Sequence, residues 1–406
     1  MEMKAGYKQT EAGVIPEDWD VLGILEVADF FNGKPYEKNI KDGGQYFLIT
    51  LDSIDIDGYL KKDHKQIDIL DGSLKKGDLV TVLSDLAHGN LLGLCDLIPE
   101  DDRYVLNQRM GCIRIKSEAI PLYLRSQINT RQHHFKIRGQ GTSQKHIYKK
   151  DFATLRIPFP NHEEQRAITT VICDIEALVD SLGSLITKKR NFKQAAMQQL
   201  LTGQTRLAGF DGVWEIKIIG EIAEIVSGGT PSTRDFLYWN GDIKWCTPTD
   251  ITRCQAKYIN NTERKITNLG LSKSGAKLLP PGTLLLCSRA TIGEVRIALT
   301  AITTNQGFKS LICKPGINNE FVYYKLLTMK QQMIDRSFGS TFLEISKANV
   351  AALELEIPPE EEQAAIAAVL SDMDNEIEAL EQRRDKTRAL KQGMMQELLT
   401  GRTRLI

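Results

Sequence analysis

The sequence predicts a mixed α/β protein built from two pseudo-repeated halves, each of which ends in a long helix. Residues 200–207 read LLTGQTRL, and residues 398–405 read LLTGRTRL. Aligned without gaps at this offset of 198, residues 163–207 and 361–405 are identical at 21 of 45 positions. Short β-branched runs between Gly and Pro turns also recur upstream of both stretches. The chain therefore contains an internal duplication, which sets its domain plan.

The repeat divides the chain into four segments. The first globular α/β segment covers residues 1–157, and the first long helix with its exit covers 158–207. The second globular segment covers residues 208–356, and the second long helix covers 357–406.

Each long helix carries a coiled-coil pattern between clear start and stop signals. Asn161 and Glu164 predict a capping box, Pro358-Pro359 opens the second helix, and Gly203 and Gly401 predict the helix ends. Apolar residues alternate in steps of four and three, which is typical of a coiled-coil seam. The predicted seam is Ile168, Ile172, Ile175, Val179 and Leu182 in the first helix, and Ile366, Leu370, Met373, Ile377 and Leu380 in the second. We therefore expect the two helices to pair antiparallel and to separate the two globular segments.

Composition indicates a soluble, cytoplasmic protein. No apolar run approaches the roughly 18 residues of a membrane span, and the N-terminus lacks the apolar core of a signal peptide. The seven cysteines are scattered and never spaced C-x-x-C, so we expect reduced thiols rather than disulfides or zinc.

Charge is balanced overall but uneven along the chain. Residues 103–150 contain 11 Lys or Arg and one acid, and residues 251–350 contain 14 Lys or Arg and 5 acids. Each half thus has a basic segment upstream of its long helix, as a surface that binds a polyanion requires.

The sequence contains no recognisable catalytic motif. It has no G-x-x-x-x-G-K-[ST] phosphate loop, no G-x-G-x-x-G after a strand and no N-P-P-[YF] or D-P-P-Y tetrapeptide. The six histidines lack metal-ligand spacing, and the E-x-K triplet Glu263–Lys265 has no counterpart in the first half. We therefore expect no catalytic residue, no metal and no cofactor in this chain.

The loops upstream of the helices are the candidate functional elements. Hydroxyls beside glycine and nearby cations suit phosphate oxygens. The candidates for DNA contact are Arg131, Lys136, Arg138, Thr142, Ser143 and Lys145 in the first half, and Arg289, Lys309, Arg336, Ser340 and Thr341 in the second. The repeated pairs Asn107-Gln108 and Asn305-Gln306 either recognise adenine edges or build a turn.

Together these motifs resemble the specificity (S) subunit of type I restriction-modification enzymes. The resemblance rests on both LLTG-x-TRL endings, the starts at Trp19 and Trp214, residues 288–293 (SRATIG), residues 304–307 (TNQG) and residues 339–341 (GST). In the first half, residues 84–89 (SDLAHG) stand where S-R-x-T-I-G is expected.

The resemblance implies that residues 1–157 and 208–356 are target recognition domains, each of which recognises one part of a bipartite DNA site. The paired helices would then fix the spacer and dock two modification subunits that use S-adenosylmethionine to methylate adenine N6. Restriction subunits would supply ATP- and Mg-dependent translocation and cleavage, and this chain would itself be non-catalytic.

Two other functions stay open at this point. A self-contained DNA methyltransferase or nuclease would need catalytic motifs that the sequence lacks. A coiled-coil scaffold that never touches DNA would leave the basic segments without a role.

Overall fold

The computed structural model describes residues 5–86, 88–116, 119–339 and 343–405, which form two compact units. The first unit comprises Met1–Gly183 and Gln382–Ile406, and the second comprises Ser184–Glu381. Each unit therefore holds one globular segment, the first part of one long helix and the last part of the other. Within the described residues, no helix is long and apolar enough to cross a membrane.

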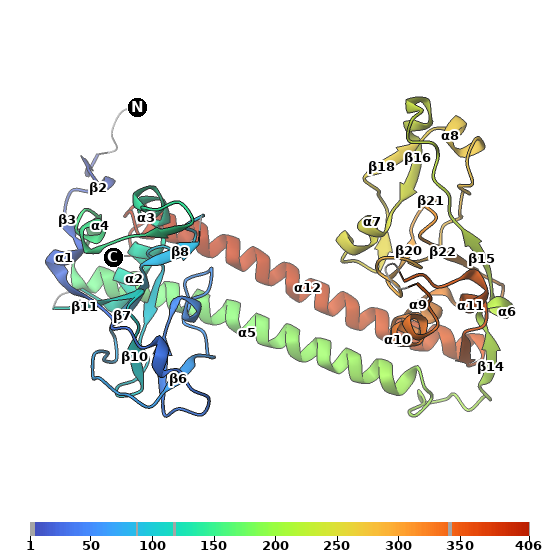
Figure 1. Cartoon of the computed structure of the whole chain (residues 1–406), viewed down its shortest axis with the longest axis horizontal. Helices are drawn as coiled ribbons and strands as arrows, with labels where there is room; N and C mark the ends of the chain where they lie inside the picture. The colour runs from blue at the N-terminus through green and yellow to red at the C-terminus, as the bar shows by residue number, and fades with distance from the viewer. Residues whose placement is uncertain (1–4, 87, 117–118, 340–342, 406) are drawn as a thin grey trace. The chain divides into compact units, whose positions relative to one another are not determined.

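The first unit is a mixed α/β structure (Figure 1). Its strands are β1 (Tyr7–Thr10), β2 (Gly13–Pro16), β3 (Asp20–Gly23), β4 (Ala28–Asn32), β5 (Tyr46–Ile49), β6 (Lys65–Ile67), β7 (Leu79–Val82), β8 (Ser84–Leu86), β9 (Cys95–Leu97), β10 (Tyr104–Leu106), β11 (Met110–Ile115), β12 (Gln144–His146) and β13 (Arg156–Phe159). Its helices are α1 (Ile24–Val27), η1 (Glu37–Asn39), η2 (Leu51–Ser53), α2 (Pro121–Asn129), α3 (Gln132–Arg138), α4 (Lys149–Ala153) and the start of α5 (His162–Leu200).

The second unit has a similar set of strands and helices. Its strands are β14 (Glu215–Ile218), β15 (Ala223–Ser227), β16 (Trp239–Cys246), β17 (Tyr258–Ile259), β18 (Arg264–Ile266), β19 (Leu284–Leu286), β20 (Val295–Ala298), β21 (Thr303–Thr304), β22 (Lys309–Cys313) and β23 (Glu354–Ile357). Its helices are α6 (Ile219–Ile222), η3 (Phe236–Tyr238), α7 (Pro248–Arg253), α8 (Asn268–Ser272), α9 (Asn319–Thr328), α10 (Lys330–Asp335), α11 (Lys347–Ala351) and the start of α12 (Glu360–Leu398).

The strand order shows that the duplication includes the globular segments. The main sheet has the order β4-β11-β7-β9 in the first unit and β15-β22-β19-β20-β17 in the second. A smaller sheet has the order β10-β5-β6 in one unit and β21-β16-β18 in the other, with β10–β5 and β21–β16 parallel. Both units thus have one topology, to which the first adds the β1–β2 and β8–β12 pairs and the second adds β17.

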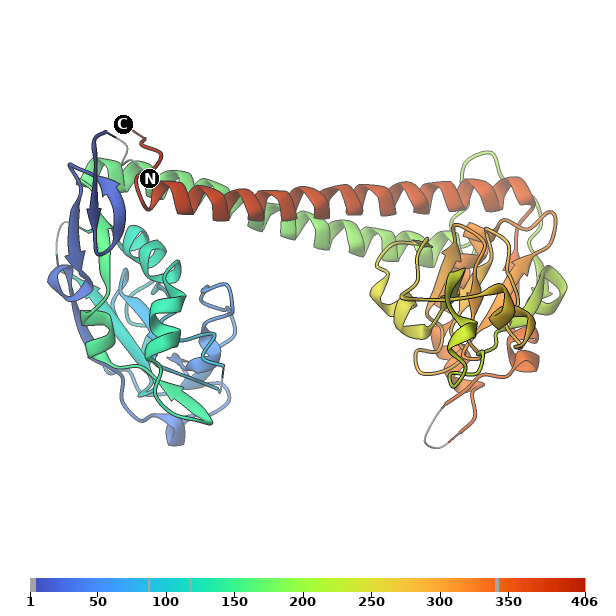
Figure 2. The same cartoon turned by 90° about the horizontal axis from the view of Figure 1, so that it is seen from above.

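In each unit the two long helices lie side by side and run antiparallel (Figure 2). In the first unit Glu176 pairs with Lys391. In the second, Lys189 pairs with Glu376 and Lys193 pairs with Asp374, so rising numbers on α5 meet falling numbers on α12. The predicted antiparallel pairing is confirmed within each unit.

Residues of the coiled-coil seam also form part of the hydrophobic cores of the globular segments. The predicted seam residues are buried or half-buried, and Ile168 and Ile172 pack in one core with Leu398 and Leu399. Gly203 and Gly401 follow the helices with φ of 69° and 68°, the left-handed conformation that ends a helix. The ends of both helices therefore stabilise the globular parts directly.

Candidate nucleic-acid interface

Three chain segments meet side by side at one place in each unit. In the first unit the backbone N–H of Leu83 donates to Arg109 O (3.2 Å), and that of Ile147 donates to Leu83 O (2.9 Å). In the second unit Ser288 donates to Gly307 O (2.8 Å) and Ile345 donates to Ser288 O (3.1 Å). We call this surface the loop face. It comprises residues 84–86, 107–109 and 144–147 in the first unit, and residues 288–289, 305–307 and 343–345 in the second.

The first segment of the loop face is the repeated Asn-Gln pair, which follows a parallel strand pair. The backbone N–H of Asn107 donates to Ile49 O, and that of Asn305 donates to Cys246 O, at 3.1 and 3.0 Å. Asn107 is buried, and the Oδ1 atom of Asn305 accepts from the backbone N–H of Gly307. Asn305 therefore builds the turn with its side chain, whereas Asn107 builds it with its backbone O, which accepts from the N–H of Met110 (2.9 Å).

A glycine from an earlier turn fixes this segment in both units. A Cβ atom on Gly33 would lie 2.2 Å from Asn107 O, and one on Gly228 would lie 2.0 Å from Asn305 O. Only glycine permits such close approach of two backbones, so the segment is held rigidly.

The second segment corrects the expected alignment of the two halves. Gly293 donates its N–H to Cys287 O, and the residue that makes the same bond in the first unit is Gly93, which donates to Val82 O. Gly93 also shares the positive φ of Gly293. The expectation that residues 84–89 replace the S-R-x-T-I-G pattern is therefore wrong. Its T-I-G end corresponds to residues 91–93, and the first half has five extra residues within 83–93.

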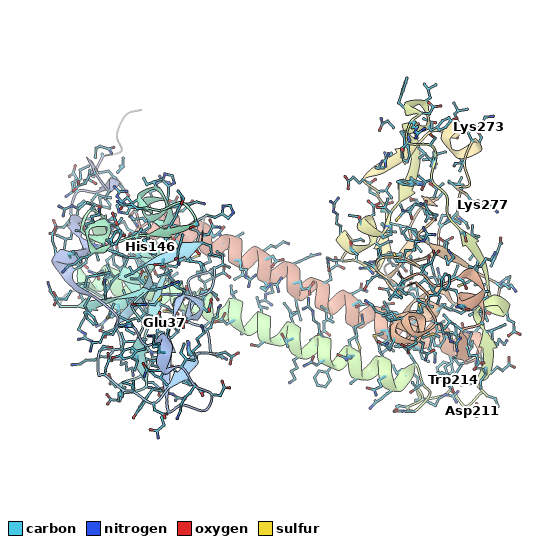
Figure 3. The ribbon with its side chains drawn as sticks, in the orientation of Figure 1. Glu37, His146, Asp211, Trp214, Lys273 and Lys277 are labelled. Atoms are coloured by element: carbon cyan, nitrogen blue, oxygen red, sulfur yellow. The ribbon has the colours of Figure 1, made fainter. Side chains whose placement is uncertain are left out.

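The third segment is a hairpin that contains several predicted site residues. In the first unit, β12 pairs with β8, and His146 Nδ1 lies 2.7 Å from Ser84 Oγ. His146 is marked in Figure 3. Thr142 and Ser143 are exposed at the tip of the hairpin, and Lys145 is half-exposed beside Asp85.

Helix α3 contributes cations with different surroundings. The Nζ atom of Lys136 donates to Asn90 Oδ1 (2.9 Å) and remains exposed, and Arg138 donates to His134 O (3.1 Å). The guanidinium of Arg131 instead donates to Gln127, and burial lowers its pKa. Arg131 therefore stabilises the end of α2, whereas Lys136 faces solvent.

The second unit places its cations beside an acid. Arg289 Nε lies 2.8 Å from Glu344 Oε2, and Lys309 Nζ lies 3.4 Å from Glu344 Oε1. Burial alone would raise the pKa of Glu344, but the hydrogen bond and charge of Arg289, together with Lys309, lower it overall. Lys309 is itself buried, so it contacts Glu344 from the interior of the unit rather than from its surface.

Three more residues of the second unit were predicted to contact DNA. Arg336 is exposed and donates to Ala352 O (2.9 Å). Ser340 and Thr341 lie outside the described residues.

Sequence reasoning missed the role of the repeated LLTG-x-TRL ending, which clasps the start of the other copy's helix. In the first unit Arg404 pairs with Glu164, which is completely buried and also accepts from Trp19 Nε1 (2.9 Å). In the second unit Arg206 pairs with Glu362, which accepts from Trp214 Nε1 (3.2 Å). We call each Trp–Glu–Arg set the clasp.

The clasp also corrects the predicted capping box. The Oδ1 atom of Asn161 accepts from the backbone N–H of Glu164 (2.9 Å), as predicted. The Glu164 carboxylate, however, binds Trp19 and Arg404 instead of returning to the N-terminus of α5. Glu164 and Glu362 occupy the same position in the two repeats. This repetition was the sequence signal that the acid has a role beyond capping one helix.

A second contact ties the helix ends to the globular parts. Gln127 Nε2 donates to Leu399 O (3.0 Å) in the first unit, and Lys325 Nζ donates to Leu201 O (2.5 Å) in the second. Both donors are buried and lie on equivalent helices, α2 and α9.

Charged clusters also join each globular part to the helix that starts in its unit. In the first unit Glu176 binds Arg125 (3.0 Å) and Lys391 (2.7 Å). In the second unit Glu320 binds Lys257 and Ser371, both at 2.6 Å. These clusters differ in sequence but hold the same elements together.

The described residues offer little for catalysis or metal binding. In the part of the chain that the structure describes, no group of three or more His, Cys, Asp or Glu side chains could hold a metal. Burial raises the pKa of the Cys287 thiol to about 12, which disfavours a nucleophilic thiolate. Glu263 of the E-x-K triplet is exposed and pairs with Arg253.

The fold and the loop face define a tandem α/β protein whose two units share one backbone frame but present different side chains on it. Comparison with known proteins gives the family. Residues 16–187 and 212–387 match the model of the type I restriction modification DNA specificity domain. The chain belongs to this family, and the resemblance seen in its sequence is confirmed.

Related proteins agree with this assignment. The type I restriction enzyme MjaIX specificity subunit of Methanocaldococcus jannaschii is 44% identical over 167 residues, which are 41% of this chain and 39% of that protein. The putative MjaX specificity subunit of the same organism is 25% identical over 98% of this chain and 97% of its own length.

Solved structures show the same fold. The S subunit of a type I restriction-modification system from M. genitalium has a TM-score of 0.61 at 14% identity and covers 98% of both chains. A chain from a structural study of assembly and conformational transition in the type I R-M system has a TM-score of 0.59 at 18% identity. It covers 95% of this chain and 99% of that one.

Proposed function

We propose that this chain is the DNA-recognising specificity subunit of a type I restriction-modification complex, and that each unit recognises one part of a bipartite site. The observation that carries the proposal is the loop face, which occurs once per unit on the same backbone frame with different side chains. A duplicated frame with different surface residues suits two recognition modules with different targets.

Exposed or half-exposed cations and exposed hydroxyls on and beside the loop face supply the contacts to phosphate. In the first unit these are Lys136, Arg138, Lys145, Thr142 and Ser143, and in the second Arg289 and Arg336. Such contacts position a protein on DNA without recognising its sequence. Arg131 and Lys309 are not among these contacts, because their side chains bind other groups of the protein.

The paired helices serve as the spacer and as the docking surface for two adenine-N6 methyltransferase subunits. Several large apolar side chains stay exposed on the helices although the seam itself is buried. They are Leu178 and Leu390 in the first unit, and Leu185 and Phe192 in the second, with exposed fractions of 38–57%. Exposed apolar side chains along a helix pair suit a further helix from a partner subunit.

Catalysis belongs to the partner subunits in this proposal. The modification subunits bind S-adenosylmethionine, and the restriction subunits use ATP and Mg, so this chain itself is non-catalytic.

Mapping of methylated adenines tests the proposal directly. DNA is sequenced from cells that contain the modification subunits with and without this chain. We expect methylation that depends on the chain, at a motif of two fixed parts separated by a spacer of constant length. A motif that stays the same without the chain would refute the proposal, and so would transfer of labelled methyl groups to DNA by the purified chain alone.

A further inference from the structure

Gln108 and Gln306 are the exposed residues of the otherwise constrained Asn-Gln segments. Each follows the end of a parallel strand pair, and each preceding asparagine builds the turn. Because Gly33 and Gly228 pack directly on the backbone of this segment, the position of each glutamine Cα is fixed. The two side chains therefore leave the same point of the frame in both units.

In the first unit a carboxylate orients the glutamine amide. Gln108 Nε2 donates to Glu37 Oε1 at 3.0 Å, and Glu37 lies in η1, just after the turn that contains Gly33. Burial alone would raise the pKa of Glu37, but hydrogen bonds from its own backbone, Gln108 and Asn107 lower it overall. An ionised carboxylate only accepts hydrogen bonds, so the Gln108 nitrogen must face Glu37. The Gln108 oxygen is then left to accept. Glu37 is marked in Figure 3.

In the second unit a hydroxyl takes the place of the carboxylate. Thr230 Oγ1 donates to Gln306 Oε1, from the turn that contains Gly228. Here the amide oxygen is engaged, and the two N–H bonds of Gln306 Nε2 are left to donate. The equivalent positions of the two units thus differ: Gln108 keeps a free oxygen and one N–H, whereas Gln306 keeps both N–H bonds and only one lone pair.

Base edges in the DNA major groove differ in the same way. Adenine N6 and cytosine N4 donate hydrogen bonds, whereas guanine O6 and N7 and thymine O4 accept them. A glutamine held by a neighbouring side chain loses little conformational freedom on binding. A glutamine that turns its oxygen toward the base would therefore favour adenine or cytosine. One that turns its nitrogen toward the base would favour guanine or thymine.

We propose that Gln108 with Glu37 recognises the exocyclic amino group of an adenine or cytosine in one half-site, and that Gln306 recognises a hydrogen-bond-accepting base edge in the other. The inference rests on the proposed function, which it deepens by naming one base-recognising side chain per unit. It also decides between the two interpretations of the Asn-Gln pair: the asparagine is structural and the glutamine recognises DNA.

Methylation motifs of single variants test this inference in the complete complex. Gln108→Ala should lower the preference for one base in one half of the motif by roughly tenfold, the order of discrimination of a good side-chain–base pair, and leave the other half unchanged. Gln306→Ala should do the same in the other half. Glu37→Gln, which can donate as well as accept, should relax the same position as Gln108→Ala. Gln9→Ala and Gln331→Ala alter exposed glutamines away from the loop face and should leave both halves unchanged.

The outcomes separate this inference from the proposed function. Absence of methylation that depends on the wild-type chain would refute the proposed function, and the inference with it. A wild-type motif that both glutamine variants leave unchanged would overturn only the inference, as would changes by both variants in one half. If Gln108→Ala abolishes all methylation, Gln108→Glu, which is similar in size and adds a charge, decides. A changed base preference in one half supports the inference, and an unchanged motif overturns it.

Discussion

The two units differ least where the long helices enter them and most at the loop face. Each clasp joins a tryptophan, a buried glutamate and an arginine in the same way, although the arginine and glutamate come from different copies of the repeat. On and beside the loop face, Lys145 and Lys136 of the first unit form no ion pair among the described residues, whereas Arg289 of the second is paired with Glu344. The comparison teaches that one frame is built twice and carries two different binding surfaces.

The clasp and the loop-face glycines have the largest expected effects, and the clasp comes first. Glu164→Gln keeps an acceptor for Trp19 but removes the charge that Arg404 needs. We expect a loss of about 2 kcal/mol in the free energy of unfolding, below the value for a fully buried pair because Arg404 is partly exposed. Chemical denaturation measures it. Glu362→Gln should destabilise the second unit in the same way, and a stable Glu362→Gln protein would break the equivalence of the clasps.

The loop-face frame should be equally sensitive in both units. Gly33→Ala and Gly228→Ala each place a Cβ atom against a carbonyl oxygen and should cost about 1–3 kcal/mol of stability. Gly393→Ala is the matched control, because its Cβ meets no atom within 4 Å and alanine favours a helix by about 1 kcal/mol. Thermal unfolding of the three variants should give two lower midpoints and one higher one. An unchanged midpoint for either loop variant would mean that the frames are not equally rigid.

Salt dependence of DNA binding should distinguish the two faces. Lys136→Ala with Lys145→Ala removes two cations that form no ion pair among the described residues, so the slope of log K against log salt should become shallower by about 1.8. Arg289→Ala should change the slope by less than about 0.9, since Glu344 already neutralises part of its charge. Fluorescence anisotropy of the assembled complex at several salt concentrations measures both slopes. Equal changes per cation would contradict the difference between the faces.

The smallest effect should be a pH dependence shared by both units. Burial alone would raise the pKa values of Glu176 and Glu320, but Arg125 and Lys391 around Glu176, and Lys257 and Ser371 around Glu320, lower them overall. A lowered pKa means that the folded state binds the proton less readily than the unfolded state. Stability is therefore present above the ordinary glutamate pKa of about 4.5 and is lost as the pH falls below it.

Unfolding midpoints between pH 6 and pH 3 test this dependence. Glu176→Gln should flatten it by removing one such group, and Glu320→Gln should flatten it to a similar degree. A dependence that neither variant alters would show that the clusters do not contribute.

The periodic parts of the fold were predictable from the sequence. The heptad pattern and the terminal glycines gave both helices to within one or two residues, and the β-branched runs gave the main strands. These signals are local, because helix periodicity and turn residues act over a few positions.

The missed features depend on pairing between distant residues. Two copies of one helix do not reveal that Arg404 binds Glu164 and Arg206 binds Glu362, since the same residue types would satisfy either pairing. Sequence alignment also placed residues 84–89 opposite the S-R-x-T-I-G pattern, because the extra residues become apparent only from the hydrogen bonds of Gly93.

Charge counts likewise do not reveal which cations are exposed. Arg131 and Lys309 contribute to the basic segments, yet one binds Gln127 and the other is buried beside Glu344. Lys136 and Lys145 have the same charge, but Lys136 is exposed and Lys145 is half-exposed.

Photo-crosslinking of the assembled complex to its methylation site tests the central claim most directly. A photoreactive amino acid replaces Lys145 in the first unit or Arg289 in the second, with exposed Gln9 on β1 as a control position. We predict crosslinks from position 145 to one half of the site only and from position 289 to the other half only, with few from position 9. Crosslinks from both loop faces to the same half, or from neither, would contradict the claim that each unit recognises its own part of the DNA.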